Sequence, residues 1–401
     1  MPERDRDLDL FFEQLVEGRL SRRQVLQRLG AAGLTFSSAG TLLAACGGTE
    51  GTDKTDESKA VQGNHPKTQI EQLNFSNWPL YIDKKVLRDF EKEYGGKVKY
   101  TEEINENEEF FGKVRQQLQR GDSLNRDIVV LTDWMAGRWV RSGWCEPKDK
   151  RNIPNEKNLQ PGLREPQFDP TRSYTLPWQS GMSAIGYNPK KTGRKLTSTN
   201  DLFDPKFKGR VSMIADPRDS ASLVLILQGK RTDTATTDDW LAAIEKIDEE
   251  NKKGQIRRFT GNDYTTDLAK GNLWACVAYS GDVIALQADN PDLEFLIPEE
   301  GAVLWNDNML MPQKPPNPYA AETMMNYVYD PQVAAKIAAY VNYVTPVVGA
   351  KEELAKDDPK LAEDELIFPS EETLGNLQPY PFWEPDQEEE IVSAMQQVTG
   401  A

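Results

Sequence analysis

One apolar run of the sequence carries an indole and a carboxylate two residues apart: Gly301-Ala302-Val303-Leu304-Trp305-Asn306-Asp307-Asn308-Met309-Leu310-Met311. Side chains alternate between the two faces of a strand, so a strand here would present Trp305 and Asp307 on one face. An aromatic wall beside an anion is a suitable place for an organic cation. The alternative is the end of a strand whose Trp305 packs in the core and whose Asp307 is solvated.

Strands and helices are expected to alternate on both sides of this run. Strand patterns followed by helical patterns occupy 70–76 and 84–94, then 98–104 and 108–119, and a third strand pattern occupies 127–131. The C-terminal part is expected to be helical at 318–329, 331–343 and 387–398. This alternation predicts an α/β fold with a largely parallel sheet.

Composition limits the class of protein. The chain has 401 residues, of which 38% are apolar, and a formal net charge of −16. These values are typical of a soluble globular protein, and the length predicts two lobes. An acidic chain without a basic face is a poor partner for nucleic acid, whereas it suits a cationic ligand.

The first 45 residues have the pattern of a signal peptide rather than of a fold. Arg22-Arg23 precedes a mildly apolar run at 29–45 that ends in Leu43-Ala44-Ala45-Cys46-Gly47. The arginine pair resembles the twin-arginine export signal, with general secretory export as the alternative. The Leu-Ala-Ala-Cys sequence resembles a bacterial lipobox, which implies cleavage before Cys46 and acylation of its thiol. Residues 46–67 have few aliphatic side chains and predict a disordered tether between the lipid and the body.

Several catalytic classes are excluded by the residues present. The single histidine, His65, falls in the predicted tether, which argues against histidine-dependent hydrolysis and most zinc or iron sites. Glycine-rich phosphate-binding motifs and the G-x-S-x-G motif are absent from the sequence, and no spacing singles out a carboxylate pair. The sequence therefore predicts a binding protein that is not an enzyme and uses no metal or cofactor. Cys145 and Cys276 are expected to be buried and unpaired.

Aromatic and polar side chains follow two of the predicted strands. Trp78 and Tyr81 come after the first strand, and Thr132 and Trp134 after the third. Ligands of open α/β sheets bind outside the carboxyl ends of the strands, so these residues are candidate ligand contacts. The alternative is that the aromatic rings pack their loops onto the body.

Two carboxylates, Asp216 and Asp219, follow a strand pattern at 209–214 and flank Arg218. Asp216 and Asp219 suit the cap and first turn of the next helix, but residues three apart also share a helix face that could line a cleft. Arg218 could neutralise whichever carboxylate is left without a ligand. Farther along, Tyr279 ends an apolar strand and is a contact candidate, whereas Asp282 is expected to cap a helix.

Together these pieces resemble one family, the extracytoplasmic spermidine/putrescine-binding proteins of polyamine ABC transporters. The resemblance extends from about residue 70 to 384 and is carried by separate stretches in the same order. They are Asn77-Trp78-Pro79-Leu80-Tyr81, Glu103-Ile104-Asn105-Glu106-Asn107-Glu108-Glu109-Phe110, Leu176-Pro177-Trp178-Gln179-Ser180-Gly181-Met182, Asp216-Pro217-Arg218-Asp219-Ser220, Leu304-Trp305-Asn306-Asp307 and Asn342-Tyr343-Val344-Thr345-Pro346.

The resemblance implies a two-lobed fold of the periplasmic-binding-protein type (type II), with the ligand in the cleft. It places lobe 1 at 68–181 plus 305–345 and lobe 2 at 182–304 plus 346–401. The residues that match the family's ligand contacts are Trp78, Tyr81, Thr132, Trp134, Asp216, Asp219, Tyr279, Trp305, Asp307 and Tyr343. Thr132 stands where serine is familiar, Trp134 where tyrosine is, and Tyr279 where some members have an indole. The family's C-terminal glutamine contact has no clear counterpart in 376–384.

The function that this resemblance implies is capture of putrescine or spermidine and delivery to an ABC permease. Such a protein would be a monomer held by a lipid on Cys46 at the extracytoplasmic face of the membrane. Buried ammonium groups need carboxylates and the methylene spacer needs apolar walls, so Asp307 would hold one end of the ligand and Asp216 or Asp219 the other. The alternatives are a binding protein of the same fold for a sugar, an amino acid or a betaine, and a sensor or surface lipoprotein.

Overall fold

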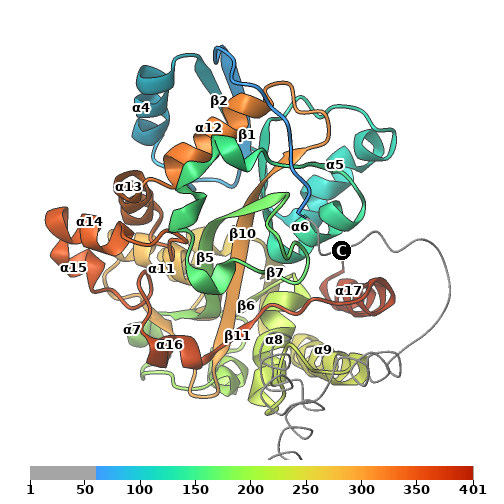
Figure 1. Ribbon diagram of the computed structural model, residues 1–401. Helices are drawn as coiled ribbons and strands as arrows, with labels where there is room; N and C mark the ends of the chain where they lie inside the picture. Colours follow the sequence, from blue (N-terminus) through green and yellow to red (C-terminus); the bar gives the residue numbers. More distant parts are fainter. Residues whose placement is uncertain (1–59, 401) are drawn as a thin grey trace, which may run out of the picture. The chain divides into compact units, whose positions relative to one another are not determined.

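The computed structural model describes residues 60–400 (Figure 1). The predicted signal peptide, Cys46 and the first part of the predicted tether lie outside the described residues. Within 60–400, no helix combines the length and the apolar character needed to cross a membrane.

The described chain is built on one mixed sheet of eleven strands. The strands are β1 (Gln72–Asn77), β2 (Lys97–Glu102), β3 (Ile128–Thr132), β4 (Cys145–Glu146), β5 (Thr175–Tyr187), β6 (Val211–Ile214), β7 (Ile256–Thr260), β8 (Ala275–Tyr279), β9 (Glu294–Leu296), β10 (Ala302–Pro312) and β11 (Leu377–Pro379). The main path runs β2-β1-β3-β10-β5-β8-β6-β7. Pairing is parallel within β2-β1-β3 and within β8-β6-β7, as expected for α/β units, so the predicted α/β class is confirmed.

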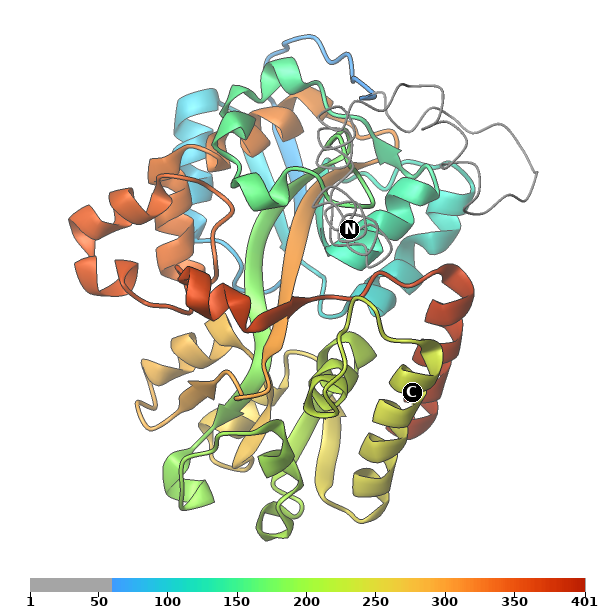
Figure 2. The ribbon, with the colours of Figure 1, turned by 60° about the horizontal axis from the view of Figure 1, so that its bottom comes forward.

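Two lobes share the long antiparallel pair β5 and β10, which runs through the described body (Figures 1 and 2). The distal half of β10 pairs with β3 in lobe 1, where Asp307 lies opposite Thr132. The distal half of β5 pairs with β8 in lobe 2, where Ser183 lies opposite Tyr279. Side chains at the centre of this pair therefore lie between the lobes.

Helices cover the faces of both lobes. Those of lobe 1 are α4 (Lys84–Tyr94), α5 (Asn107–Gln119), α6 (Asp133–Arg141), α12 (Pro318–Val328), α13 (Pro331–Val341), α14 (Ala350–Asp357) and α15 (Pro359–Ala362). Those of lobe 2 are α7 (Pro189–Thr192), α8 (Pro217–Leu227), α9 (Thr237–Lys252), α10 (Tyr264–Ala269), α11 (Ser280–Gln287) and α17 (Pro385–Thr399). The short helix α16 (Glu371–Gly375) comes just before the point where the chain joins lobe 2. Short 3-10 helices occupy Lys150–Asn152, Pro154–Asn158, Pro161–Leu163, Thr199–Phe203 and Pro205–Phe207.

Local sequence explains where the helices begin and end. The Asp83 side chain accepts a hydrogen bond from the Lys85 backbone at the start of α4, and Gly95 ends the helix with φ 80°. Helix α13 was expected to reach residue 343, but Asn342 adopts a left-handed conformation with φ 58° and ends the helix at Val341. Tyr343 is therefore on the irregular segment after α13, which lies beside β5 through paired backbone hydrogen bonds between Ser180 and Val344.

The segment after residue 345 differs from the sequence-based division of the lobes. It was expected in lobe 2, but Val347, Ala350, Leu354 and Ala362 lie in the same hydrophobic core as α12 and α13 of lobe 1. The apolar sides of α14 and α15 pack against the helices that immediately precede them in the chain. Only after residue 376 does the chain join lobe 2, where α17 lies beside α9 (Figure 2).

The described end of the predicted tether, 60–67, also differs from a disordered segment. Val61 donates its backbone N–H to Ser173 at 3.0 Å, and Gly63 donates its own to the Lys148 carbonyl at 2.9 Å. His65 Nδ1 lies 2.6 Å from a carboxylate oxygen of Glu322, a side chain with no exposed surface. Hydrogen bonds to buried polar groups hold this segment on lobe 1. Composition alone does not predict these hydrogen bonds.

Both described cysteines are free and buried, as expected. Cys145 lies on β4 in lobe 1 and Cys276 on β8 in lobe 2. Burial raises the pKa of both thiols well above the usual range, so neither is a ready nucleophile.

Candidate ligand-binding site

A cavity of about 510 Å³ lies between the lobes, at the carboxyl ends of the parallel strands. Lobe 1 contributes residues that follow β1, β2 and β3, and lobe 2 contributes residues that follow β6, β7 and β8. The strand β10 adds Trp305 and Asp307 from the shared centre of the sheet. These two side chains share a face, as the alternation in the sequence predicts.

All ten candidate contact residues named from the sequence line this one cavity: Trp78, Tyr81, Thr132, Trp134, Asp216, Asp219, Tyr279, Trp305, Asp307 and Tyr343. The wall also contains residues that were not candidates, among them Asn105, Asn107, Asn262, Thr265, Asp282 and Tyr380. The structure thus brings the candidates together, and their contact with a ligand stays a prediction.

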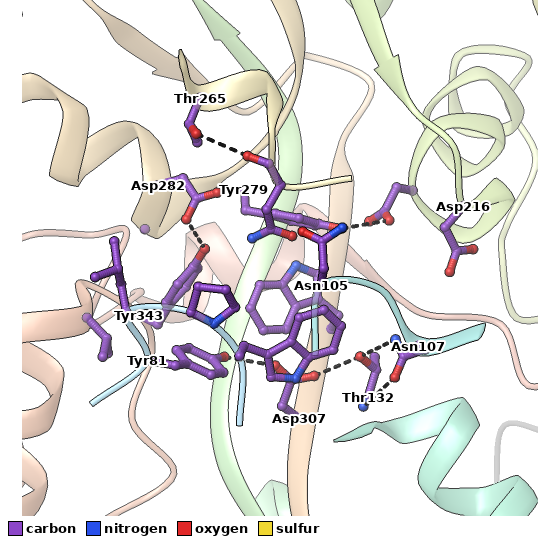
Figure 3. A pocket seen from close by; sticks show the side chains of 18 of the residues that line it. Tyr81, Asn105, Asn107, Thr132, Asp216, Thr265, Tyr279, Asp282, Asp307 and Tyr343 are labelled. Carbon is purple, nitrogen blue, oxygen red and sulfur yellow. Dashed lines mark hydrogen bonds between the residues drawn. The ribbon is translucent and has the colours of Figure 1, made fainter. Parts of the chain in front are cut away.

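Asp307 is held by neutral donors only. Thr132 Oγ1 donates to one carboxylate oxygen at 2.8 Å, and Tyr81 OH donates to the other at 2.9 Å (Figure 3). Asn107 Nδ2 in turn donates to Thr132 Oγ1 at 3.0 Å and orients its hydroxyl. Burial raises the pKa of Asp307 to about 7, against the opposing effect of these hydrogen bonds.

Asp219 has a similar environment on the side of lobe 2. Ser183 Oγ donates to it at 2.5 Å, Tyr279 OH donates at 3.1 Å, and Tyr380 OH makes a third hydrogen bond. Burial and the neighbouring charge of Asp216 raise the pKa of Asp219 to about 7. Asp219 was a possible helix cap in the sequence, but its side-chain oxygens accept hydroxyl hydrogen bonds instead.

Asp282 is a third carboxylate of this kind, half-buried rather than buried, and the sequence did not single it out as a ligand contact. It was expected to cap α11, but Tyr279 occupies the cap position of that helix. The Asp282 carboxylate accepts a hydrogen bond from Tyr343 OH at 3.0 Å (Figure 3). It accepts a second from Tyr264 OH at 2.8 Å. Burial raises the pKa of Asp282 to about 6.

Aromatic rings surround these carboxylates. The Trp305 ring lies edge-to-face with Tyr279 at 5.6 Å and with Tyr343 at 5.2 Å between centroids, and Tyr343 meets Tyr81 at 5.5 Å. Two glycines make room for them: a Cβ on Gly181 would lie 2.3 Å from the Trp305 ring, and one on Gly281 would lie 2.6 Å from the Tyr343 ring. The rings can therefore serve as apolar and quadrupolar walls.

Asp216 differs from Asp219, Asp282 and Asp307 because it has a cationic partner. It caps α8 by accepting the Arg218 backbone N–H at 2.8 Å, as the sequence predicts. The guanidinium of Arg218 also lies 3.5 Å from the same carboxylate and 3.7 Å from the centroid of the Trp134 ring. Asp216 and Trp134, two of the predicted ligand contacts, thus both contact the side chain of Arg218.

The chemistry of the cavity is that of a site for an organic cation. Among the described residues that line it there is no lysine or arginine, while Asp219, Asp282 and Asp307 meet only hydroxyl donors. A cation that enters the cavity can form ion pairs with partly desolvated carboxylates and cation–π contacts with the aromatic faces. In residues 60–400 no group of three or more His, Cys, Asp or Glu side chains is arranged to hold a metal ion.

Comparison with known proteins gives a consistent picture. The family model described as "Bacterial extracellular solute-binding protein" matches residues 85–368. The chain is 27% identical over 306 residues to the spermidine/putrescine-binding periplasmic protein of Escherichia coli K12, covering 76% of this chain and 85% of that one. It is 30% identical over 304 residues to the putrescine-binding periplasmic protein PotF of the same organism, covering 70% of this chain and 80% of PotF.

Among solved structures, the spermidine/putrescine ABC transporter substrate-binding protein PotD of Streptococcus pneumoniae has the same fold. It superposes with a TM-score of 0.69 at 24% sequence identity and covers 82% of this chain and 99% of that one. The two-lobed solute-binding fold expected from the sequence is therefore confirmed.

Proposed function

The chain belongs to the family of bacterial extracellular solute-binding proteins, and from this premise we propose that it captures a polyamine for an ABC permease. The observation that carries the proposal is a set of three carboxylates, the buried Asp219 and Asp307 and the half-buried Asp282, that face an aromatic-walled cavity without a lysine or arginine in its lining. A di- or triamine supplies what these groups need, because its ammonium ends pair with carboxylates and its methylenes lie against the rings. Two relatives are named as a spermidine/putrescine-binding protein and a putrescine-binding protein, which supports this proposal.

The proposed contacts divide by chemistry. Asp307 receives one ammonium group, with Tyr81 and Thr132 holding the carboxylate in place. Asp219 receives another, held by Tyr279. The remaining proposed aromatic contacts, which line the same cavity, are Trp78, Trp305 and Tyr343.

Capture is proposed to occur by closure of the lobes about β5 and β10. These strands connect lobes that carry opposite walls of the cavity, so a small bend in the pair changes the distance between Asp307 and Asp219. A ligand that bridges both carboxylates favours the closed arrangement because it gains its second ion pair only there.

We also propose, from the sequence, that the protein is exported and held by a lipid on Cys46 at the extracytoplasmic face of the membrane. The arginine pair and the Leu43-Ala44-Ala45-Cys46 sequence support this. Replacing Cys46 by Ser should release the protein from the membrane fraction of cells without altering ligand affinity. Retention of that variant in the membrane fraction would refute the lipid anchor.

Isothermal titration calorimetry of the purified protein tests the ligand. Putrescine, cadaverine and spermidine are titrated, with a neutral sugar and a betaine as matched solutes. One-to-one binding of a polyamine, and no binding of the sugar, is expected. Binding of the betaine alone would leave the cationic site standing but would refute a diamine, and binding of the sugar alone would refute a site for cations.

A further inference from the structure

A series of ion pairs crosses from lobe 1 to lobe 2 beside the ligand-binding cavity. Arg138 of α6 lies 2.8 Å from Glu108 of α5 in its own lobe and 3.0 Å from Glu388 of α17 in lobe 2. Glu388 also pairs with Arg218 of α8, whose other partner is Asp216 at 3.5 Å. Of the ion pairs formed within residues 60–400, only Arg138–Glu388 joins one lobe to the other.

This inter-lobe ion pair is largely shielded from water but does not lie in a packed core. The side chain of Arg138 is 20% exposed and that of Glu388 is 12% exposed. A second hollow, of about 580 Å³, lies beside the pair, between α5 and α6 of lobe 1 and the first turns of α17 in lobe 2. Shielded ion pairs are weakened less by salt than exposed ones, and lobes that meet at a hollow can separate without disrupting a close-packed core.

The indole of Trp134 lies between this network and the ligand-binding cavity. Trp134 lines the cavity, and the guanidinium carbons of Arg138 and Arg218 lie 5.2 Å and 3.7 Å from the centroid of its ring. Neither arginine is among the described residues that line the cavity, so neither contacts a ligand there. An effect of Arg138 on binding therefore has to act through the lobes or through Trp134.

We propose that Arg138 and Glu388 form a latch that stabilises the closed arrangement of the lobes and thereby slows release of the ligand. This inference rests on the proposed function, in which the lobes close about β5 and β10. Separation of the lobes lengthens this pair, whereas the pairs of Arg138 with Glu108 and of Arg218 with Asp216 each lie within one lobe. The apparent affinity of a ligand depends on the population of the closed arrangement, so a contact made only there strengthens binding without touching the ligand. Arg138 is thus a positioning residue.

Stopped-flow kinetics of putrescine binding to Arg138→Gln test the latch. The dissociation rate constant should rise by about fivefold and the association rate constant should stay within about twofold of wild type, because the pair forms only after the ligand has entered the cleft. Arg120→Gln is the control: Arg120 pairs with Asp122 at 2.8 Å in the same lobe, and both rate constants should match those of wild type. An unchanged dissociation rate in Arg138→Gln would overturn the inference and leave the proposed function intact.

A double-mutant cycle separates the inter-lobe pair from the other contacts of Arg138. The guanidinium also lies against the rings of Trp134 and Phe111, and it pairs with Glu108. In a Glu388→Gln background, Arg138→Gln should change the dissociation rate by less than about twofold, since the partner in lobe 2 is already neutral. A change as large as in the wild-type background would overturn the inference, because contacts within lobe 1 would then account for the effect.

Scattering without ligand keeps the latch testable if the wild-type protein binds no polyamine and the proposed function fails. Fewer molecules of Arg138→Gln should have their lobes closed, so its radius of gyration in small-angle X-ray scattering should exceed that of wild type and of Arg120→Gln. Equal radii would overturn the inference. Should Arg138→Gln not fold by circular dichroism, Glu388→Gln makes the same test from lobe 2, and faster dissociation or a larger radius is again the expected result.

Discussion

Asp307, which is buried, and Asp216, which is half-buried, are carboxylates in the wall of one cavity, and they differ in their bonding partners. Asp307 accepts hydrogen bonds from the hydroxyls of Thr132 and Tyr81 and has no cationic partner among the described residues. Asp216 caps a helix and lies 3.5 Å from the guanidinium of Arg218. One carboxylate is prepared for a cation from outside, and the other already has one.

This difference distinguishes a proposed binding group, Asp307, from a carboxylate that is already paired within the protein, Asp216. Hydroxyl donors orient a carboxylate without cancelling its charge, so a cation can still gain a full ion pair there. A carboxylate that already pairs with a buried arginine gains much less from a second cation. Proximity to the cavity alone does not distinguish these cases, whereas the hydrogen-bond and ion-pair partners do.

The largest expected effect comes from Asp307→Asn. Removing the charge should weaken putrescine binding by about a hundredfold or more, since a buried ammonium group would lose its charged partner. Calorimetry measures the affinity, and circular dichroism should show an unchanged fold. Asp89→Asn on α4, which removes a carboxylate that pairs with Lys92 outside the cavity, is the control and should bind normally. Equal affinities of Asp307→Asn and wild type would contradict the assignment of the unpaired carboxylate.

Trp305→Ala should weaken binding by about thirtyfold, because it removes both the apolar wall and the cation–π attraction but leaves the charge of the site unchanged. Trp305→Phe, which keeps a ring next to Tyr279 and Tyr343, should lose much less. A loss in Trp305→Phe as large as that in Trp305→Ala would show that the ring size, rather than its aromatic face, is what the ligand needs.

Acidification tests the unpaired carboxylates as a group. The pKa values of Asp219 and Asp307 are raised to about 7 and that of Asp282 to about 6, so these groups take up protons as the pH falls below neutrality. Polyamine affinity should therefore fall by about tenfold between about pH 8 and about pH 5.5. The stability of the protein without ligand should change in the opposite direction with pH. The folded state holds protons on these carboxylates that the unfolded chain releases, so their contribution to the free energy of unfolding is lost as the pH rises through about 7.

Thermal unfolding with and without putrescine across this pH range measures both the stability of the free protein and the affinity for the ligand. An affinity that does not depend on pH would contradict the assignment of these carboxylates to the binding site.

The smallest expected effect concerns the hydroxyl that orients Asp307. Thr132→Val keeps the shape of the side chain but removes its hydrogen bonds to Asp307 and Asn107, and affinity should fall by about threefold. Thr132→Ser retains the hydroxyl and should bind within about twofold of wild type. A loss comparable to that of Asp307→Asn would mean that the hydroxyl itself binds the ligand.

Local sequence predicted most of the helices and strands and part of the cavity wall. The alternation of side chains placed Trp305 and Asp307 on one face, and the rule that ligands bind at the carboxyl ends of strands pointed to Trp78, Tyr81, Thr132 and Trp134. These inferences depend only on neighbouring residues and on the α/β pattern. The resemblance to a known family then joined positions that lie far apart in the chain.

What the sequence missed depends on long-range packing. Asp282 has the local pattern of a helix cap, and only the approach of Tyr264 and Tyr343 shows that its carboxylate faces the cavity. Tyr380 follows β11, which pairs in parallel with β10, and its hydroxyl donates to Asp219. No local sequence pattern predicts that β11 pairs with β10. The packing of α14 and α15 on lobe 1 was missed for the same reason.

The attachment of the N-terminal segment to lobe 1 has a mechanical consequence. Tension applied to the chain at Val61 enters the body through the hydrogen bonds of Val61 to Ser173, Gly63 to Lys148 and His65 to Glu322, all within lobe 1. The lipid anchor proposed for Cys46 would therefore hold lobe 1 directly, and the proposed closure of the cleft would move lobe 2 relative to the held lobe.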